Sequence, residues 1–136
     1  MKSKTAPVRA PKARKKKKIL LVDDDTALTR VLAELLDHAG YDAIQASYSL
    51  PALFEVVRQL PDLILVDINM PIMNGLELVE QFKSYEETRH VPIVVMTGMD
   101  TPQAREVVRE LGCVGFLPKP IDGKKFPAQV AKFLRA

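Results

Sequence analysis

Side chains able to bind a metal ion and a phosphate group follow the apolar runs of this 136-residue chain. Three aspartates come after the run 19–22, one follows the run 63–66, a threonine follows 93–96, and a lysine stands just beyond 114–117. These residues are Asp23, Asp24, Asp25, Asp67, Thr97 and Lys119. Carboxylates that lie close together repel one another, and a hard divalent cation relieves that repulsion. With a hydroxyl and an ammonium group beside them, they form a set suited to phosphoryl transfer.

The types of these residues favour magnesium and an aspartyl phosphate. No thiolate or histidine lies in the set, which argues against zinc. Asp67 is the single acid after its run, and a carboxylate can attack phosphorus to form an acyl phosphate. Thr97 and Lys119 would then bind the phosphate oxygens. We therefore expect Asp67 to be the phosphate acceptor.

Two hydrophobic periods alternate along the chain and predict five βα units. Strands are predicted for the short apolar runs, and helices for the stripes of apolar residues at helical spacing. The strand runs are 19–22, 43–46, 63–66, 93–96 and 114–117, and the helical stripes are 28–39, 53–60, 76–82, 104–111 and 126–134. Continuous apolar strands and short crossovers indicate an open, doubly wound α/β sandwich around a parallel sheet. Ligands bind such sheets beyond the carboxyl ends of the strands, where the polar residues fall.

Charge divides the chain into two parts. Residues 1–18 hold nine of the 20 basic residues and no acid, so eleven basic residues remain against all 17 acids, a net charge of −6. Residues 1–17 cannot bury enough apolar surface to offset their ordering entropy, and we expect a disordered basic tail before a folded domain at 18–136. The single cysteine excludes an intrachain disulfide, and no apolar run is long enough to span a membrane. A cytoplasmic protein is expected.

Four segments of the sequence resemble the receiver domain of response regulators, as found in chemotaxis receivers and other two-component systems. They are ILLVDDD at 19–25, LILVDINMPIMNG at 63–75, VVMTG at 94–98 and GFLPKP at 115–120. The resemblance covers the chain from residue 19 to 134 and implies a flavodoxin-like fold. In that fold five helices surround a five-stranded parallel sheet of order 2-1-3-4-5.

The resemblance also implies a role for each matching residue. Asp23, Asp24, Asp67 and the backbone carbonyl of Asn69 match the Mg²⁺ ligands, and Asp67 also matches the phosphoacceptor. Thr97 matches the switch hydroxyl, the amide of Gly98 would help to bind the phosphate, and Lys119 matches the lysine that pairs with it. Phe116 matches the switch aromatic, where tyrosine is commoner. The Lys119–Pro120 bond matches one that is usually cis.

The implied function is a single-domain response regulator and phosphoprotein of a phosphorelay. A histidine kinase or phosphotransfer protein would phosphorylate Asp67, and the face formed by the fourth helix, fifth strand and fifth helix would then bind an effector protein. The domain would catalyse only its own phosphorylation and slow dephosphorylation, so it is not expected to be an enzyme in the usual sense. Because the sequence ends one helix after Lys119, we expect either that the output is binding to another protein or that the sequence is part of a longer chain. A monomer or weak homodimer is expected.

Three other functions fit parts of the sequence less well. An aspartyl-phosphate phosphatase usually has a second aspartate two residues after its nucleophile, where this chain has Asn69. A nucleotide-binding module needs a glycine-rich loop after its first strand, where Asp23, Asp24 and Asp25 would repel phosphates. The basic tail could bind nucleic acid or an anionic membrane, or fold back on its own acidic domain, but a solvated, disordered leader is the favoured interpretation.

Several residues have ordinary structural interpretations. Asp25 is expected to cap a helix that begins near Thr26. Cys113 is expected to be a small buried hydrophobic residue, and His38 and His90 are expected at the surface.

Overall fold

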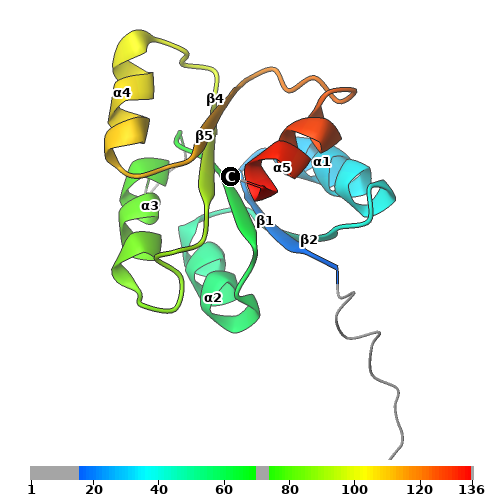
Figure 1. Cartoon of the computed structure of the whole chain (residues 1–136), viewed down its shortest axis with the longest axis horizontal. Helices are drawn as coiled ribbons and strands as arrows, with labels where there is room; N and C mark the ends of the chain where they lie inside the picture. Colours follow the sequence, from blue (N-terminus) through cyan, green and yellow to red (C-terminus); the bar gives the residue numbers. More distant parts are fainter. Residues whose placement is uncertain (1–15, 70–73, 136) are drawn as a thin grey trace, which may run out of the picture.

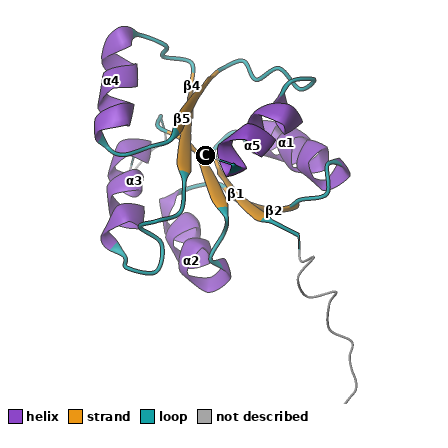
Figure 2. Ribbon diagram, viewed as in Figure 1, coloured by secondary structure: helices purple, strands orange, loops and turns teal. Residues whose placement is uncertain are grey.

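The computed structural model describes residues 16–69 and 74–135, and within them five strands alternate with five helices along the chain (Figures 1 and 2). The strands are β1 (Lys18–Val22), β2 (Asp42–Ala46), β3 (Leu63–Asp67), β4 (Ile93–Thr97) and β5 (Gly115–Pro118). The helices are α1 (Thr26–His38), α2 (Ser49–Gln59), α3 (Gly75–Ser84), α4 (Pro102–Glu110) and α5 (Phe126–Leu134).

All five strands form one parallel sheet with the order β2-β1-β3-β4-β5. The order predicted from the resemblance is confirmed. Strand β1 pairs with β2 and β3, and the chain then adds β4 and β5 on the far side of β3. The direction of strand addition therefore reverses at β1, and such a reversal opens a crevice at the carboxyl edge of the sheet.

Each face of the sheet carries its own hydrophobic core, because successive strand residues point to opposite sides. Leu20 and Val22 of β1 pack with α2, α3 and α4, whereas Ile19 and Leu21 pack with α1 and α5. The helices divide in the same way in the ribbon view (Figure 2). Since both faces are covered, the three central strands are apolar at nearly every position, as the continuous runs in the sequence predicted.

The observed elements differ from the sequence prediction mainly at their ends. Strands β3 and β4 run one residue further than the apolar runs and include Asp67 and Thr97, while β5 begins at Gly115 instead of Val114. Helix α2 begins at Ser49, four residues before its predicted stripe. Pro51 does not prevent this, because it lies in the first turn, where proline is tolerated. Some stripe residues lie on exposed helix surfaces: Val31, Val57, Leu60 and Val107.

Two helices are followed by glycines whose φ angles are positive. Gly40 and Gly112 lie just beyond α1 and α4 and have φ angles of 95° and 84°, a backbone region that favours glycine. At the other end of the chain, the predicted tail falls mostly on residues 1–15, which lie outside the described residues. None of the described helices has the length and apolar character needed to cross a lipid bilayer.

Candidate functional site

The sheet order brings four of the predicted site residues to one edge. Asp23 follows β1, Asp67 ends β3, Thr97 ends β4 and Lys119 follows β5. These strands are consecutive neighbours in the sheet, so their carboxyl ends lie side by side. A backbone hydrogen bond also joins the ends of β4 and β5, because the Lys119 amide donates to the Thr97 carbonyl at 2.8 Å.

Three carboxylates meet at this edge in an arrangement that fits a divalent cation. Asp23, Asp24 and Asp67 each offer an oxygen that lies within 4.8 Å of the others. Asp23 and Asp67 are buried, and Asp24 is exposed, so the cluster opens to solvent on one side. Among the described residues, no hydrogen-bond partner of good geometry reaches the buried Oδ2 of Asp23. Its nearest cationic group is the Lys119 ammonium at 2.8 Å, and the three carboxylates together are hard oxygen donors that suit Mg²⁺.

Asp67 lies in an environment that resists ionisation. Burial is the largest influence and raises the pKa of its carboxyl above the ordinary value, and the charge of Asp23 acts in the same direction. The Asn69 amide donates a hydrogen bond to Asp67 Oδ1 at 3.1 Å and opposes this shift, as does Lys119. The pKa of Asp67 is raised overall. A cation that binds beside Asp67 would therefore stabilise its ionised form.

Lys119 places an ammonium group beside this cluster. Its Nζ lies 2.8 Å from Asp23 Oδ2 and 3.5 Å from Asp67 Oδ2. Burial acts to lower the pKa of the ammonium group, but the two carboxylates outweigh it and raise the pKa. The contact with Asp23 is close but poorly aligned for a hydrogen bond, so it is best described as an ion pair. The peptide bond from Lys119 to Pro120 is cis, as the resemblance implied.

Thr97 is buried beside Asp67 and its hydroxyl oxygen accepts two hydrogen bonds. The Met99 amide donates to Thr97 Oγ1 at 3.0 Å, and the side-chain amide of Asn69 donates at 3.4 Å. Asn69 thus contacts both the predicted phosphoacceptor and the predicted switch hydroxyl. Gly98 is exposed, and its α-carbon faces open space on the side where a side chain would project. A ligand could therefore approach the backbone there.

A glycine allows α3 to approach the backbone of the predicted acceptor. A Cβ atom on Gly75 would lie 2.3 Å from the Asp67 carbonyl oxygen and 2.3 Å from the Ile68 α-carbon. The Gly75 amide donates a hydrogen bond to the Ile68 carbonyl at 3.0 Å. No larger residue fits without moving the segment that carries Asp67 and Asn69.

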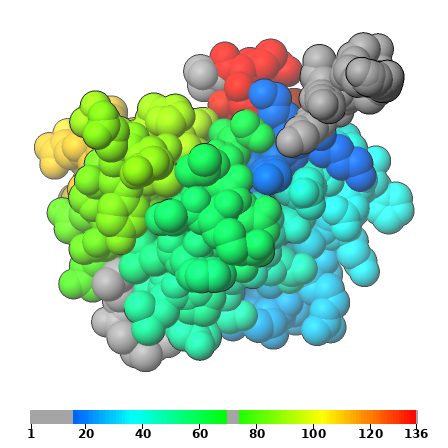
Figure 3. All heavy atoms as spheres, turned by 90° about the horizontal axis from the view of Figure 1, so that it is seen from below, coloured from blue at the N-terminus to red at the C-terminus, as the bar shows by residue number. Residues whose placement is uncertain are grey.

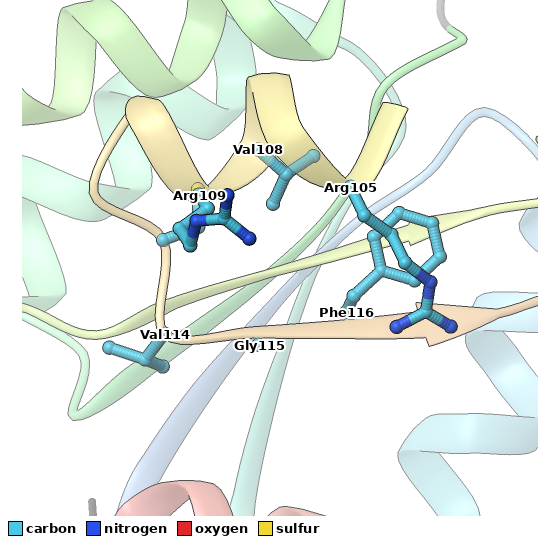
Figure 4. A pocket seen from close by; sticks show the side chains of 7 residues that line it. Arg105, Val108, Arg109, Val114, Gly115 and Phe116 are labelled. Atoms are coloured by element: carbon cyan, nitrogen blue, oxygen red, sulfur yellow. The ribbon is translucent and has the colours of Figure 1, made fainter. Parts of the chain in front are cut away.

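Phe116 lies apart from the carboxylates, at a surface pocket of about 290 Å³ between α4 and β5. It is partly exposed and packs against the core beneath. Arg105 of α4 covers its ring, with the guanidinium carbon 4.5 Å from the ring centre (Figure 4). Arg105 also donates to both carboxylate oxygens of Asp100, at 2.6 and 3.1 Å. The sequence did not identify this pair in advance. Asp100 lies in the loop before α4, and its spacing of five residues from Arg105 differs from the three or four that mark ion pairs within a helix.

The ordinary structural predictions for single residues are confirmed for Asp25, His38 and His90 and confirmed in part for Cys113. Asp25 caps α1 by accepting a hydrogen bond from the Leu28 amide at 3.0 Å. His38 and His90 are exposed. Cys113 is half-buried instead of fully buried and lines the pocket beside Phe116. The structure therefore brings together Asp23, Asp24, Asp67, Asn69, Thr97 and Lys119, and it places Phe116 on the neighbouring surface.

Comparison with known proteins agrees with this geometry. The family model for the response regulator receiver domain matches residues 19–131. This chain belongs to the response regulator receiver domain family. Among curated proteins, the polar-differentiation response regulator DivK of Brucella ovis is 31% identical over 118 residues, which cover 87% of this chain and 96% of that protein.

Solved structures of receiver domains have the same fold. Chemotaxis protein CheY4 of Vibrio cholerae superposes with a TM-score of 0.83 and 26% identity, covering 87% of this chain and 98% of that one. The non-phosphorylated receiver domain of HemR from Leptospira biflexa gives a TM-score of 0.81 and 30% identity, covering 89% and 96%. The chain is thus a receiver domain of the two-component type, with the aspartate cluster at the edge where receiver domains generally bind Mg²⁺.

Proposed function

We propose that this receiver domain is a phosphorylation switch whose acceptor is Asp67 and whose cofactor is Mg²⁺. One observation carries the proposal. Asp67 ends the central strand β3 with two further carboxylates within 4.8 Å and the Lys119 ammonium 3.5 Å away. A buried nucleophile between a metal-binding set and a fixed cation is what phosphoryl transfer requires.

In the proposed reaction, a carboxylate oxygen of Asp67 attacks the phosphorus of a phosphohistidine on a kinase or phosphotransfer protein. A P–O bond forms, the P–N bond breaks, and the donor imidazole retains the electron pair and takes up a proton. Asp23, Asp24, Asp67 and the carbonyl of Asn69 would hold Mg²⁺, which neutralises charge on the phosphoryl oxygens when it is bound. Lys119 would pair with another phosphoryl oxygen.

The hydrogen bonds of Thr97 suggest how the switch works. The Thr97 hydroxyl accepts hydrogen bonds from the Met99 backbone amide and the Asn69 side-chain amide, which hold it at the same edge of the sheet as Asp67. A phosphoryl group on Asp67 would be a stronger acceptor and would draw the Thr97 hydroxyl and Lys119 toward it. Movement of Thr97 would free space for Phe116 to turn inward and would favour an active form of the α4-β5-α5 face.

The proposed partners follow from this cycle. The named relatives are response regulators, which supports a kinase or phosphotransfer protein as the donor and a downstream protein as the reader of the signal. We also propose that the domain turns over no separate substrate and catalyses only its own phosphorylation and slow dephosphorylation. Asn69 supports this, because it is an amide where aspartyl-phosphate phosphatases use a carboxylic acid.

Labelling with a small phosphodonor tests the proposal. Incubation with acetyl phosphate and Mg²⁺ should add one phosphoryl group by intact mass, and hydroxylamine should remove it, as expected for an acyl phosphate. The adduct should be absent in EDTA and in the Asp67→Asn variant, and it should persist in Asp37→Asn, an exposed carboxylate on α1. No adduct on the wild-type chain, or full labelling of Asp67→Asn, would refute the proposal.

A further inference from the structure

Helix α2 carries an exposed ridge of large apolar side chains that neither the core nor the site uses. Leu50, Phe54 and Val57 are 70%, 64% and 51% exposed, and Leu60 at the helix end is 52% exposed. Residues spaced by four and three positions share one face of a helix, so the first three form a continuous line. Ser49, Ala52 and Val56 occupy the opposite, buried face.

This ridge is much more apolar than an ordinary solvent-facing helix surface. Single exposed apolar residues need no explanation, but a contiguous group marks an interaction site. Tyr48, at the N-cap of α2, adds a further ring that is 46% exposed. In the space-filling view from below, the segment that contains α2 lies on the side facing the viewer (Figure 3). The ridge is therefore open to a partner over its whole length.

We propose that the α2 ridge, defined as Leu50, Phe54, Val57 and Leu60, is a dimerisation surface that binds the same ridge of a second copy of this chain. In an antiparallel two-fold pair centred near residues 55 and 56, Leu50 meets Leu60 of the second copy. Phe54 meets Val57 of the second copy, and each contact occurs twice. The ridge is complementary to itself in this arrangement because its large residues are spread along the whole helix.

Charge complementarity favours a second copy over an unrelated partner. Glu55 and Arg58 lie on the same side of the ridge and form an ion pair of 3.0 Å within one helix. In an antiparallel pair, the same flanks of two helices face each other, so Arg58 of each copy comes within reach of Glu55 of the other. Arg58 is also 5.8 Å from the Phe54 ring centre, which places its charge at the rim of the contact. Apolar centres with such charged rims are typical of specific interfaces.

The size of the ridge sets the expected strength. A single pair of short helices buries less than about 1,200 Å² in total, the lower end of specific interfaces. The dimer should therefore form at high micromolar concentrations and dissociate on dilution. It goes beyond the proposed phosphorylation function and is independent of it, because α2 contributes no residue to the carboxylate cluster.

Sedimentation analysis over a wide range of concentrations tests the proposal on the full chain. The wild type should pass from monomer to dimer, and Phe54→Glu should raise the dissociation constant at least tenfold. Val31→Glu is the matched control, since Val31 is 54% exposed but lies on α1, across the sheet from α2. Circular dichroism of each variant checks that it is folded. Phosphorylation of Asp67, measured on the same samples, should be unchanged by Phe54→Glu, which separates this test from that of the proposed function.

A charge exchange makes the test specific to the antiparallel geometry. Glu55→Arg alone and Arg58→Glu alone should each weaken self-association, because like charges then face each other across the axis. An equimolar mixture of the two variants should form a heterodimer, because both cross-pairs again join opposite charges. A wild type that stays monomeric at millimolar concentration overturns the proposal. So does a dimer that tolerates Phe54→Glu, or a mixture that fails to associate, because the interface would then lie elsewhere or the ridge would serve another partner.

Discussion

The guanidinium of Arg105 lies 4.5 Å from the centre of the Phe116 ring, and the same group is held by both carboxylate oxygens of Asp100. Asp100 follows Met99, whose backbone amide donates a hydrogen bond to the hydroxyl oxygen of Thr97. The predicted switch hydroxyl and the predicted switch aromatic are therefore linked by a short path along the loop between β4 and α4. Arg105 stabilises the partly exposed position of the Phe116 ring, in which a cation stacks on its face.

Removal of this contact should favour the inward position of Phe116. We expect Arg105→Ala to tighten binding of a beryllofluoride phosphate mimic by about two- to fivefold, the factor that an exposed cation–π contact supports. Fluorine NMR of protein labelled with fluorophenylalanine would report the ring environment. Arg109→Ala is the control, because Arg109 lines the same pocket but pairs with Glu106. Equal effects of the two variants would contradict a specific role for Arg105.

The two hydrogen bonds between Arg105 and Asp100 should also persist in moderately acidic solution. The hydrogen bond from Arg105 is the main cause that lowers the pKa of Asp100. A carboxyl group with a lowered pKa stays ionised until the pH falls below its ordinary range, so the contact is lost only as the pH falls through that lower value. The fluorine signal of Phe116 should therefore change little between pH 7 and roughly pH 5 in the absence of Mg²⁺.

Lys119 and Mg²⁺ should compete for the same carboxylates. The ammonium lies 2.8 Å from Asp23 Oδ2, the buried oxygen that best fits a cation. We expect Lys119→Ala to bind Mg²⁺ at least about threefold more tightly, because a nearby positive charge is removed. The same variant should be less stable than the wild type in EDTA and should recover part of that loss in Mg²⁺. Thermal unfolding with and without Mg²⁺ measures both effects.

Lys132→Ala provides the comparison for that experiment, since Lys132 is exposed on α5. It should change neither Mg²⁺ affinity nor stability appreciably. Unchanged or weaker Mg²⁺ binding by Lys119→Ala would show that the ammonium does not oppose the metal.

Gly75→Ala should damage both the fold and the site. The added Cβ would lie 2.3 Å from backbone atoms of Asp67 and Ile68, and backbone cannot rotate away as a side chain can. We expect a loss of about 1–3 kcal/mol in the free energy of unfolding, together with slower phosphorylation. Urea denaturation measures the first effect. Gly123→Ala, whose Cβ would be at an ordinary 3.5 Å from a Leu35 methyl carbon, should stay within about 0.5 kcal/mol of the wild type.

Cys113 should react slowly with alkylating reagents. Burial raises the pKa of its thiol from the ordinary value of 9.0 to about 11, despite the nearby charge of Lys83. Because the thiolate is the reactive form, its fraction at pH 8 falls by roughly 100-fold. Iodoacetamide labelling followed by mass spectrometry should be correspondingly slower for the native protein than in denaturant. Similar rates in both conditions would place the thiol in an open environment.

Much of this architecture is determined by the sequence alone. The continuous apolar runs around Leu20, Leu65 and Val95 predicted buried parallel strands, because only a sheet covered on both faces needs apolar residues at successive positions. Gly40 marked a helix end through the positive φ that it tolerates. The polar residues after these runs could be assigned to one edge of the sheet, since parallel strands share a direction. Asp23, Asp67, Thr97 and Lys119 could be found in this way.

The tertiary structure decided what depends on distance and exposure. Periodicity does not distinguish Val56, which is buried, from Val57, which is half exposed, so the α2 ridge became visible only in the folded chain. The pairing of Lys119 with Asp23 in preference to Asp67 depends on differences of less than an ångström. Arg105 of α4 stacks on Phe116 of β5, and no local sequence pattern predicts the distance between these two elements. Local sequence sets the type of each element, but contacts between elements arise only when packing fixes their relative positions.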